Sequence, residues 1–151
     1  MIFLPLVALG LTFCDLGKSD NSGFARITIT HSGIDWSTGL TGDDVSYDQI
    51  DGETIGWCTI GTRIDGLEGI WYRPFNNHFY LHGSGDLSQV QAVQQNMWAQ
   101  DVCETPLQNG DIWVAECRDG YVKFKVISVG DPNGEWTAEV EYQFSTTTSF
   151  D

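Results

Sequence analysis

The last third of the chain alternates apolar and polar residues, and this pattern constrains the fold more than any other feature. The stretch "DIWVAECRDGYVKFKVISVGDPNGEWTAEVEYQF", residues 111–144, contains three such runs separated by Gly, Asp and Pro. A period of two is typical of β-strands with one buried face, because successive side chains point to opposite faces of a sheet. The sequence therefore predicts a C-terminal three-stranded antiparallel meander.

Two turns set the register that we expect for this meander. Asp119-Gly120 is a favoured two-residue hairpin turn, since both central positions need positive φ. The next connection, "DPNGE", suits a three-residue loop with Gly134 in the left-handed conformation. Both turns place the same face in the core. The first turn predicts the pairs Cys117–Val122, Ala115–Phe124, Trp113–Val126 and, on the other face, Glu116–Lys123; the second predicts Val126–Val140, Phe124–Tyr142, Val122–Phe144 and Lys125–Glu141.

Further short strands are expected upstream. They are "FARITIT", "ETIGWCTIGTRI", "GIWYRPF" and "HFYLH", separated by clusters of Gly and Asp such as "IDGLEG". Residues 86–102 have an imperfect apolar stripe that fits either a helix or a strand with a loop. The predicted fold class is mainly β, an antiparallel β-sandwich or barrel with at most one short helix. One domain is expected over residues 24–145, followed by a flexible tail over 146–151.

The N-terminal residues indicate export. Residues 1–13 are apolar except for Thr12, too short to span a bilayer as a helix but suited to the core of a signal peptide, although no Lys or Arg precedes them. "LTFC" resembles the lipobox of bacterial lipoproteins, in which the cysteine, here Cys14, is lipidated; Phe13 departs from that pattern. Residues 14–23 would form a polar tether. Lipid anchoring, simple secretion and a structural N-terminal strand remain the alternatives, and the first two predict an extracellular or cell-envelope location.

The chain is strongly acidic. Its 7 Lys and Arg residues against 21 Asp and Glu give a net charge of -14, which repels phosphate backbones and anionic lipid headgroups. We therefore expect no nucleic-acid partner, and membrane contact only through an N-terminal lipid.

One acidic loop contains candidate calcium ligands, but its spacing does not match an EF-hand, and a solvated loop is the simpler interpretation. The candidates are Asp43, Asp44, Asp48 and Asp51.

The four cysteines lack the spacing of a zinc or c-type haem site. Cys14, Cys58, Cys103 and Cys117 form no C-x-x-C arrangement. In an exported protein they are candidates for disulfide bonds: two bridges if Cys14 takes part, or one bridge and a spare thiol if Cys14 is lipidated. The spacing leaves the connectivity open.

The segment "NNHFYLH" contains two of the three histidines, His78 and His82. On a strand, residues four apart lie on one face but roughly 13 Å from each other, too far to share one metal ion. Either could still pair with His31 from a neighbouring strand. His31, His78 and His82 are thus candidate haem or metal ligands, and three ordinary polar histidines are the alternative.

No catalytic motif is present in the sequence. There is no G-x-S-x-G elbow and no dinucleotide-binding motif, and carboxylates are too abundant for any pair to indicate acid–base catalysis. We therefore expect no enzymatic activity.

Several aromatic residues beside Gly or Asp could form an exposed ligand-binding platform or fill the interior of the fold. They are Trp36, Trp57, Trp71, Tyr72 and Tyr80.

Two segments resemble known proteins. "GIDWSTG", residues 33–39, is similar to a G-F-D-F-S-T-G pattern of exported bacterial β-domains, and "GDIWVAECRDGYVKFKVISV" is similar to a later hairpin of the same domains and of HmuY-like haem-binding lipoproteins of the Bacteroidetes. The resemblance implies an exported, lipid-anchored, antiparallel β-domain and is compatible with haem binding. It identifies no ligand, since neither His78 nor His82 lies in a matching motif.

These observations predict an exported, cell-surface, non-enzymatic β-domain that binds a ligand or another protein, or that assembles with copies of itself. The alternatives are a haem- or metal-capturing surface lipoprotein and a hydrolase that uses acidic residues. The sequence requires no cofactor, although haem and calcium are both compatible with it.

Overall fold

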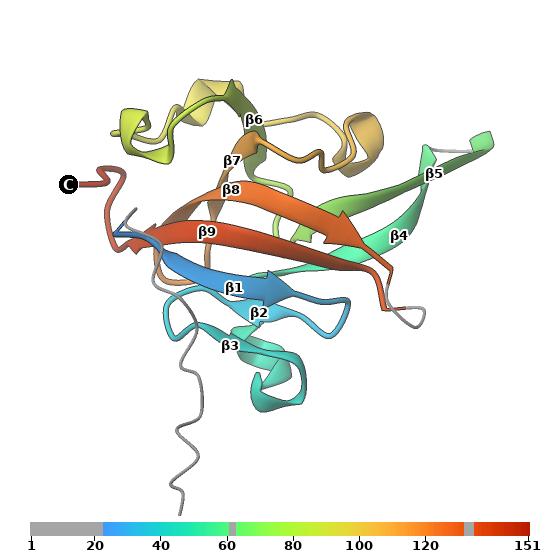
Figure 1. Cartoon of the computed structure of the whole chain (residues 1–151), viewed down its shortest axis with the longest axis horizontal. Helices are drawn as coiled ribbons and strands as arrows, with labels where there is room; N and C mark the ends of the chain where they lie inside the picture. The colour runs from blue at the N-terminus through green and yellow to red at the C-terminus, as the bar shows by residue number, and fades with distance from the viewer. Residues whose placement is uncertain (1–22, 61–62, 132–134) are drawn as a thin grey trace, which may run out of the picture.

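The computed structural model describes residues 23–60, 63–131 and 135–151, with the backbone alone for residue 57, for 59–60 and for 63–68. Its strands form two antiparallel sheets packed face to face (Figure 1). One sheet has the order β1-β9-β8-β7-β6 and the other β3-β2-β4-β5. The mainly β class is confirmed, as a two-sheet sandwich. The strands are β1 (Ala25–Ile29), β2 (Ile34–Asp35), β3 (Leu40–Thr41), β4 (Gly52–Ile60), β5 (Arg63–Pro74), β6 (Phe79–Ser84), β7 (Asp111–Glu116), β8 (Tyr121–Gly130) and β9 (Thr137–Ser145).

The main core lies between the two sheets and is built around Trp36. The Trp36 indole stacks on Phe124 with ring centroids 5.2 Å apart, and its Nε1 donates a hydrogen bond of 2.9 Å to the Tyr72 hydroxyl. A buried indole or phenol needs a polar partner, and here the two groups satisfy each other. The other fully buried members of this core include Ile29, Ile34, Ala115, Val122, Val126, Ala138 and Val140.

A second apolar layer covers the outer face of the five-stranded sheet. Residues 86–98 and the C-terminal tail pack there, and they contribute Leu87, Val90 and Phe150 as buried side chains. The tail is joined to this segment by hydrogen bonds from Val93 N to Thr148 O and from Phe150 N to Gln91 O, of 2.8 and 2.9 Å. Residues 146–151 therefore pack against the domain, where the sequence predicts a flexible tail.

Residues 86–105 form no α-helix, and the reason lies in two long-range contacts. The segment contains the short 3-10 helices η3 (Leu87–Gln89), η4 (Gln95–Met97) and η5 (Val102–Glu104). An α-helix would join Gln94 N to Val90 O. Instead, Val90 O accepts a hydrogen bond of 2.7 Å from Lys123 Nζ, and Gln94 N donates one of 3.0 Å to the Tyr80 hydroxyl. Within the described part of the chain, no helix is long and apolar enough to cross a bilayer.

The predicted meander is present as β7, β8 and β9. The four predicted β8–β9 pairs, Val122–Phe144, Phe124–Tyr142, Lys125–Glu141 and Val126–Val140, are confirmed, and the register shifts at an irregularity between Val126 and Ser128. The β7–β8 register differs from the prediction by two residues, although the same face is buried. It pairs Ala115 with Val122, Trp113 with Phe124 and Glu116 with Tyr121.

This shift arises because Asp119-Gly120 is not a two-residue turn. The hairpin closes through a hydrogen bond of 2.8 Å from Cys117 N to Gly120 O, so that residues 117–120 form a longer loop. Asp51, far away in the sequence, accepts a hydrogen bond from the backbone N–H of Arg118 in this loop. Gly120 does not have positive φ; it is required because an added Cβ would lie 2.2 Å from Ser145 O.

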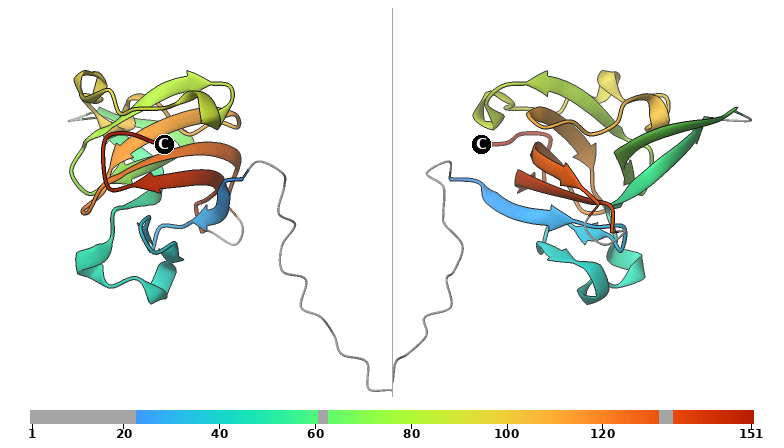
Figure 2. Two further views of the ribbon diagram at one scale, coloured as in Figure 1. Left: turned by 90° about the vertical axis from the view of Figure 1, so that its left-hand side faces the viewer. Right: turned by 45° about the vertical axis from the view of Figure 1, so that its right-hand side comes forward.

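The prediction of a single strand over residues 53–64 is wrong. β4 ends at Ile60, and β5 begins at Arg63 and pairs antiparallel with β4; it continues through "IDGLEG", which the sequence predicts to be a turn. Figures 1 and 2 show the outer ends of these two strands extending away from the rest of the domain.

Cys58 on β4 forms a disulfide bond with Cys103 in η5. Cys117 is a free, buried thiol, and its burial raises the pKa of this thiol well above the usual value. Cys14 lies outside the described residues.

Candidate functional site

A groove of about 480 Å³ at one end of the sandwich gathers exposed aromatic and cationic side chains, and we call it the arginine groove. It lies between the turn after β1, the loop before β4, the end of β5 and the loop between β7 and β8. Its volume falls within the usual range of about 300 to 1,000 Å³ for ligand sites. Its lining includes His31, Tyr47, Glu53, Arg73, Phe75 and Arg118.

Two aromatic rings are exposed in this groove. Tyr47 begins the 3-10 helix η2 (Tyr47–Gln49) and is 89 % exposed, and Phe75 follows β5 and is 41 % exposed. The position of Phe75 is fixed by a backbone hydrogen bond of 2.9 Å from its N–H to Asp51 O. Large apolar side chains gathered beside a groove commonly mark a binding surface. The two rings can therefore contact a ligand without rearrangement of the core.

Arg118 supplies a positive charge that forms no salt bridge with the described residues. Its guanidinium lies 4.8 Å from the centre of the Phe75 ring, and its Nε donates a hydrogen bond of 2.8 Å to Ile50 O. Among the residues that the structure describes, no carboxylate forms a salt bridge with Arg118, whereas Arg73 is paired with Glu53. The remaining N–H groups of a held guanidinium present a planar fork to a carboxylate or phosphate.

Asp51 lies behind the groove and fixes the loop that carries Arg118. Its side chain is 1 % exposed; Oδ2 accepts a hydrogen bond of 2.9 Å from Trp36 N, and Oδ1 accepts one of 2.7 Å from Arg118 N. Burial raises the pKa of the Asp51 carboxyl, and these two hydrogen bonds oppose that shift. Asp51 thus connects the groove to Trp36 at the centre of the core.

The structure does not bring the candidate calcium ligands together. Asp43 and Asp44 lie in the 3-10 helix η1 (Gly42–Asp44), and Asp48 lies in η2; all three are exposed, whereas Asp51 is buried and engaged by two N–H groups. The described residues contain no group of three His, Cys, Asp or Glu side chains that could hold a metal ion.

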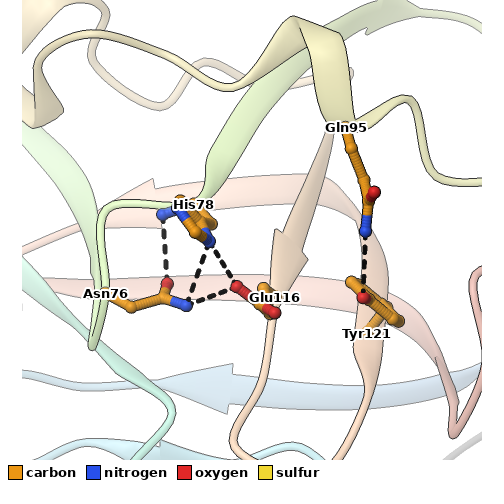
Figure 3. Close-up of polar contacts among 5 residues, drawn as sticks. All are labelled: Asn76, His78, Gln95, Glu116 and Tyr121. Atoms are coloured by element: carbon orange, nitrogen blue, oxygen red, sulfur yellow. Dashed lines mark hydrogen bonds and ion pairs between the residues drawn. The ribbon is translucent and has the colours of Figure 1, made fainter.

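His78 and His82 both lie at β6, whereas His31 lies in the turn after β1. His78 precedes β6 and contacts Glu116 through Nδ1; Asn76 accepts a hydrogen bond of 3.0 Å from His78 N and donates one of 2.5 Å to Glu116 Oε2 (Figure 3). The His78 ring also stacks on Trp98 at 5.4 Å. His82 is exposed at a bulge of β6, and His31 borders the arginine groove.

Of the two alternatives that the sequence leaves open for the five aromatic candidates, an exposed platform or a filled interior, the structure supports the interior for four of them. Trp36, Trp71, Tyr72 and Tyr80 are all buried, and only the backbone of Trp57 is described. Tyr47 and Phe75, which sequence reasoning missed, are exposed instead. The signal that could have found them is their isolation: each stands in a polar loop, in "VSYDQ" and "RPFNN", without the alternation that marks a buried strand.

No protein-family model matches this chain, and neither a curated protein sequence nor a solved structure matches it significantly. The arginine groove and the His78–Glu116 pair are therefore interpreted from their own geometry.

Proposed function

We propose that this chain is an exported, cell-surface, non-enzymatic binding domain that takes up a carboxylate-bearing sugar in the arginine groove. The observation that carries the proposal is that the Arg118 guanidinium, which forms no salt bridge with the described residues, lines one groove with two exposed aromatic rings. The disulfide bond between Cys58 and Cys103 supports export, because such bonds persist in oxidising compartments outside the cytosol.

The chemistry of the groove fits an acidic saccharide in two ways. Tyr47 and Phe75 offer apolar ring faces for the C–H face of a sugar, and Arg118 offers paired N–H donors for its carboxylate. The net charge of -14 does not prevent this pairing. At physiological ionic strength, exposed charges more than about 8 Å apart are largely screened from each other, so the adjacent guanidinium dominates.

The Arg118→Gln variant tests this assignment. We expect the full chain to bind trigalacturonic acid in isothermal titration calorimetry, and the variant to lose about tenfold or more in affinity, because a hydrogen bond to a charged group contributes about 1.5 to 3 kcal/mol. The matched control is Lys125→Gln, which removes one positive charge from β8, where Lys125 Nζ donates to Gly85 O away from the groove. Equal binding of the methyl-esterified sugar, or equal loss in both variants, would contradict the proposal.

The His78–Glu116 contact favours haem or metal capture as a second candidate function. When a carboxylate accepts the Nδ1 proton of a histidine, the ring keeps Nε2 as its ligand nitrogen, and this arrangement is common around metal-bound histidines. His78 is half-exposed, so a ligand can approach it from solvent. This version uses a single histidine and does not depend on the spacing of His78 and His82.

An absorbance titration with haem distinguishes this candidate. If His78 is the ligand, a saturable Soret shift is expected for the full chain and is lost in His78→Ala, while His82→Ala and His31→Ala keep it. A shift that survives in His78→Ala, or the absence of any saturable shift, counts against haem capture through this residue.

A further inference from the structure

A second groove, which we call the Trp136 groove, adjoins the arginine groove at Arg73. It has a volume of about 330 Å³, within the usual range of about 300 to 1,000 Å³ for ligand sites. The exposed Arg73 side chain lines both cavities. Cys58 and Cys103 also line the Trp136 groove, and their disulfide bond fixes η5 to β4 beside it. The lining further includes Ile55, Gly56, Val102 and Trp136.

The floor of the Trp136 groove belongs to the face of the four-stranded sheet that is turned away from the main core. Glu53 pairs with Arg73 across β4 and β5, and Ile55 lies two residues further along β4 on the same face. The pair between them, Thr54 and Tyr72, is buried on the core side. Ile55 is only partly buried, so the groove has an apolar floor beside the Glu53–Arg73 ion pair.

Trp136 forms a wall of this groove and connects it to the arginine groove. The residue is partly exposed, and its indole lies against Gly56, where an added Cβ would overlap the ring. Its backbone is held by a hydrogen bond of 2.6 Å from Thr54 Oγ1 to Trp136 O. The His31 ring, which lines the arginine groove, meets the Trp136 ring edge-on with centroids 5.9 Å apart. Ring contacts therefore continue from the arginine groove into the Trp136 groove.

We propose that the ligand of the arginine groove is an acidic oligosaccharide chain, and that its next sugars lie in the Trp136 groove against Trp136 and Ile55. Aromatic and aliphatic side chains can cover the C–H face of a sugar. The Glu53–Arg73 pair at the junction offers both acceptors and donors to sugar hydroxyl groups. This inference rests on the proposed function, since it names the length of the same ligand and a second set of contacts for it.

A comparison of two chain lengths tests this inference. In isothermal titration calorimetry we expect Trp136→Ala to lower the affinity for hexagalacturonic acid about fivefold or more and that for trigalacturonic acid about twofold or less, because only the longer chain extends over the lost ring. Retained binding of the trimer shows that the variant folds. An equal loss for the two sugars would mean that the ring only supports the fold, and would overturn the proposal.

Tyr121→Ala is the matched control. It removes another partly exposed aromatic ring, and Tyr121 lines neither groove. The affinity for the hexamer should therefore stay at the native value in this variant. A loss of hexamer affinity as large as that in Trp136→Ala would contradict the assignment of a sugar contact to Trp136.

The Trp136 indole signal gives a second readout, on the native chain. Two-dimensional ¹H–¹⁵N spectra follow the tryptophan indole signals, and a Trp136→Phe variant identifies that of Trp136. We expect the hexamer to shift this signal saturably. If the trimer binds and the hexamer leaves the signal unchanged, the ligand is confined to the arginine groove, so the proposed function stands and this inference fails. If neither sugar binds, both fail.

Discussion

Replacing Asp51 by Ala is expected to lower the free energy of unfolding by about 3 kcal/mol, with a range of about 2 to 5. The substitution leaves the backbone N–H groups of Trp36 and Arg118 without their acceptor, and each buried, unsatisfied donor costs about 1 to 3 kcal/mol. Urea unfolding followed by tryptophan fluorescence measures the change. Binding in the arginine groove should weaken as well, because the loop that carries Arg118 loses its attachment.

Asp48→Ala is the matched control for this experiment. Asp48 lies three positions earlier, is exposed and carries the same charge, so its loss should change the free energy of unfolding by about 0.5 kcal/mol or less. If the two variants unfold at the same urea concentration, the two hydrogen bonds to Asp51 do not stabilise the fold as argued.

Removing the disulfide bond with the double variant Cys58→Ser/Cys103→Ser is expected to destabilise the domain by about 4 kcal/mol. The bridge closes a loop with a sequence separation of 45 residues, and the chain-entropy relation gives a cost of this size for a loop of that length. The comparison of urea midpoints with and without a reducing agent provides the same measurement on the native sequence.

Cys117→Ser provides the contrast for the disulfide experiment. Cys117 is buried and free, so its replacement should cost only about 1 kcal/mol and should leave the effect of the reducing agent unchanged. A native chain whose midpoint does not move on reduction, with the bond shown by mass spectrometry to have opened, would show that the bridge adds no stability.

The sequence predicts the four β8–β9 pairs correctly from local alternation, which fixes the buried face, together with the expected length of the loop that joins the two strands. The β7–β8 register could not be predicted in the same way, because Asp51 binds Arg118 in the connecting loop from 67 positions away. Local turn chemistry favours the two-residue turn at Asp119-Gly120, and a long-range hydrogen bond overrides it.

The candidate site was harder to predict for the same reason. Whether an aromatic residue such as Trp36 or Tyr47 is buried depends on which strands face each other, and the sequence does not give the packing of the two sheets. The conformation of residues 86–102 is likewise determined by distant groups. The Lys123 ammonium and the Tyr80 hydroxyl form hydrogen bonds with backbone groups that would bond to each other in an α-helix.

The buried Lys123 ammonium has a consequence for the two ends of the folded domain. Its Nζ lies 5.4 Å from the Phe24 ring and 5.2 Å from the Phe150 ring, so residues just before β1 and near the C-terminus meet around one cation, on the same side of the sandwich (Figure 1). A domain with adjacent ends can be inserted into a loop of a host protein, or circularly permuted with a short linker, without stretching either sheet.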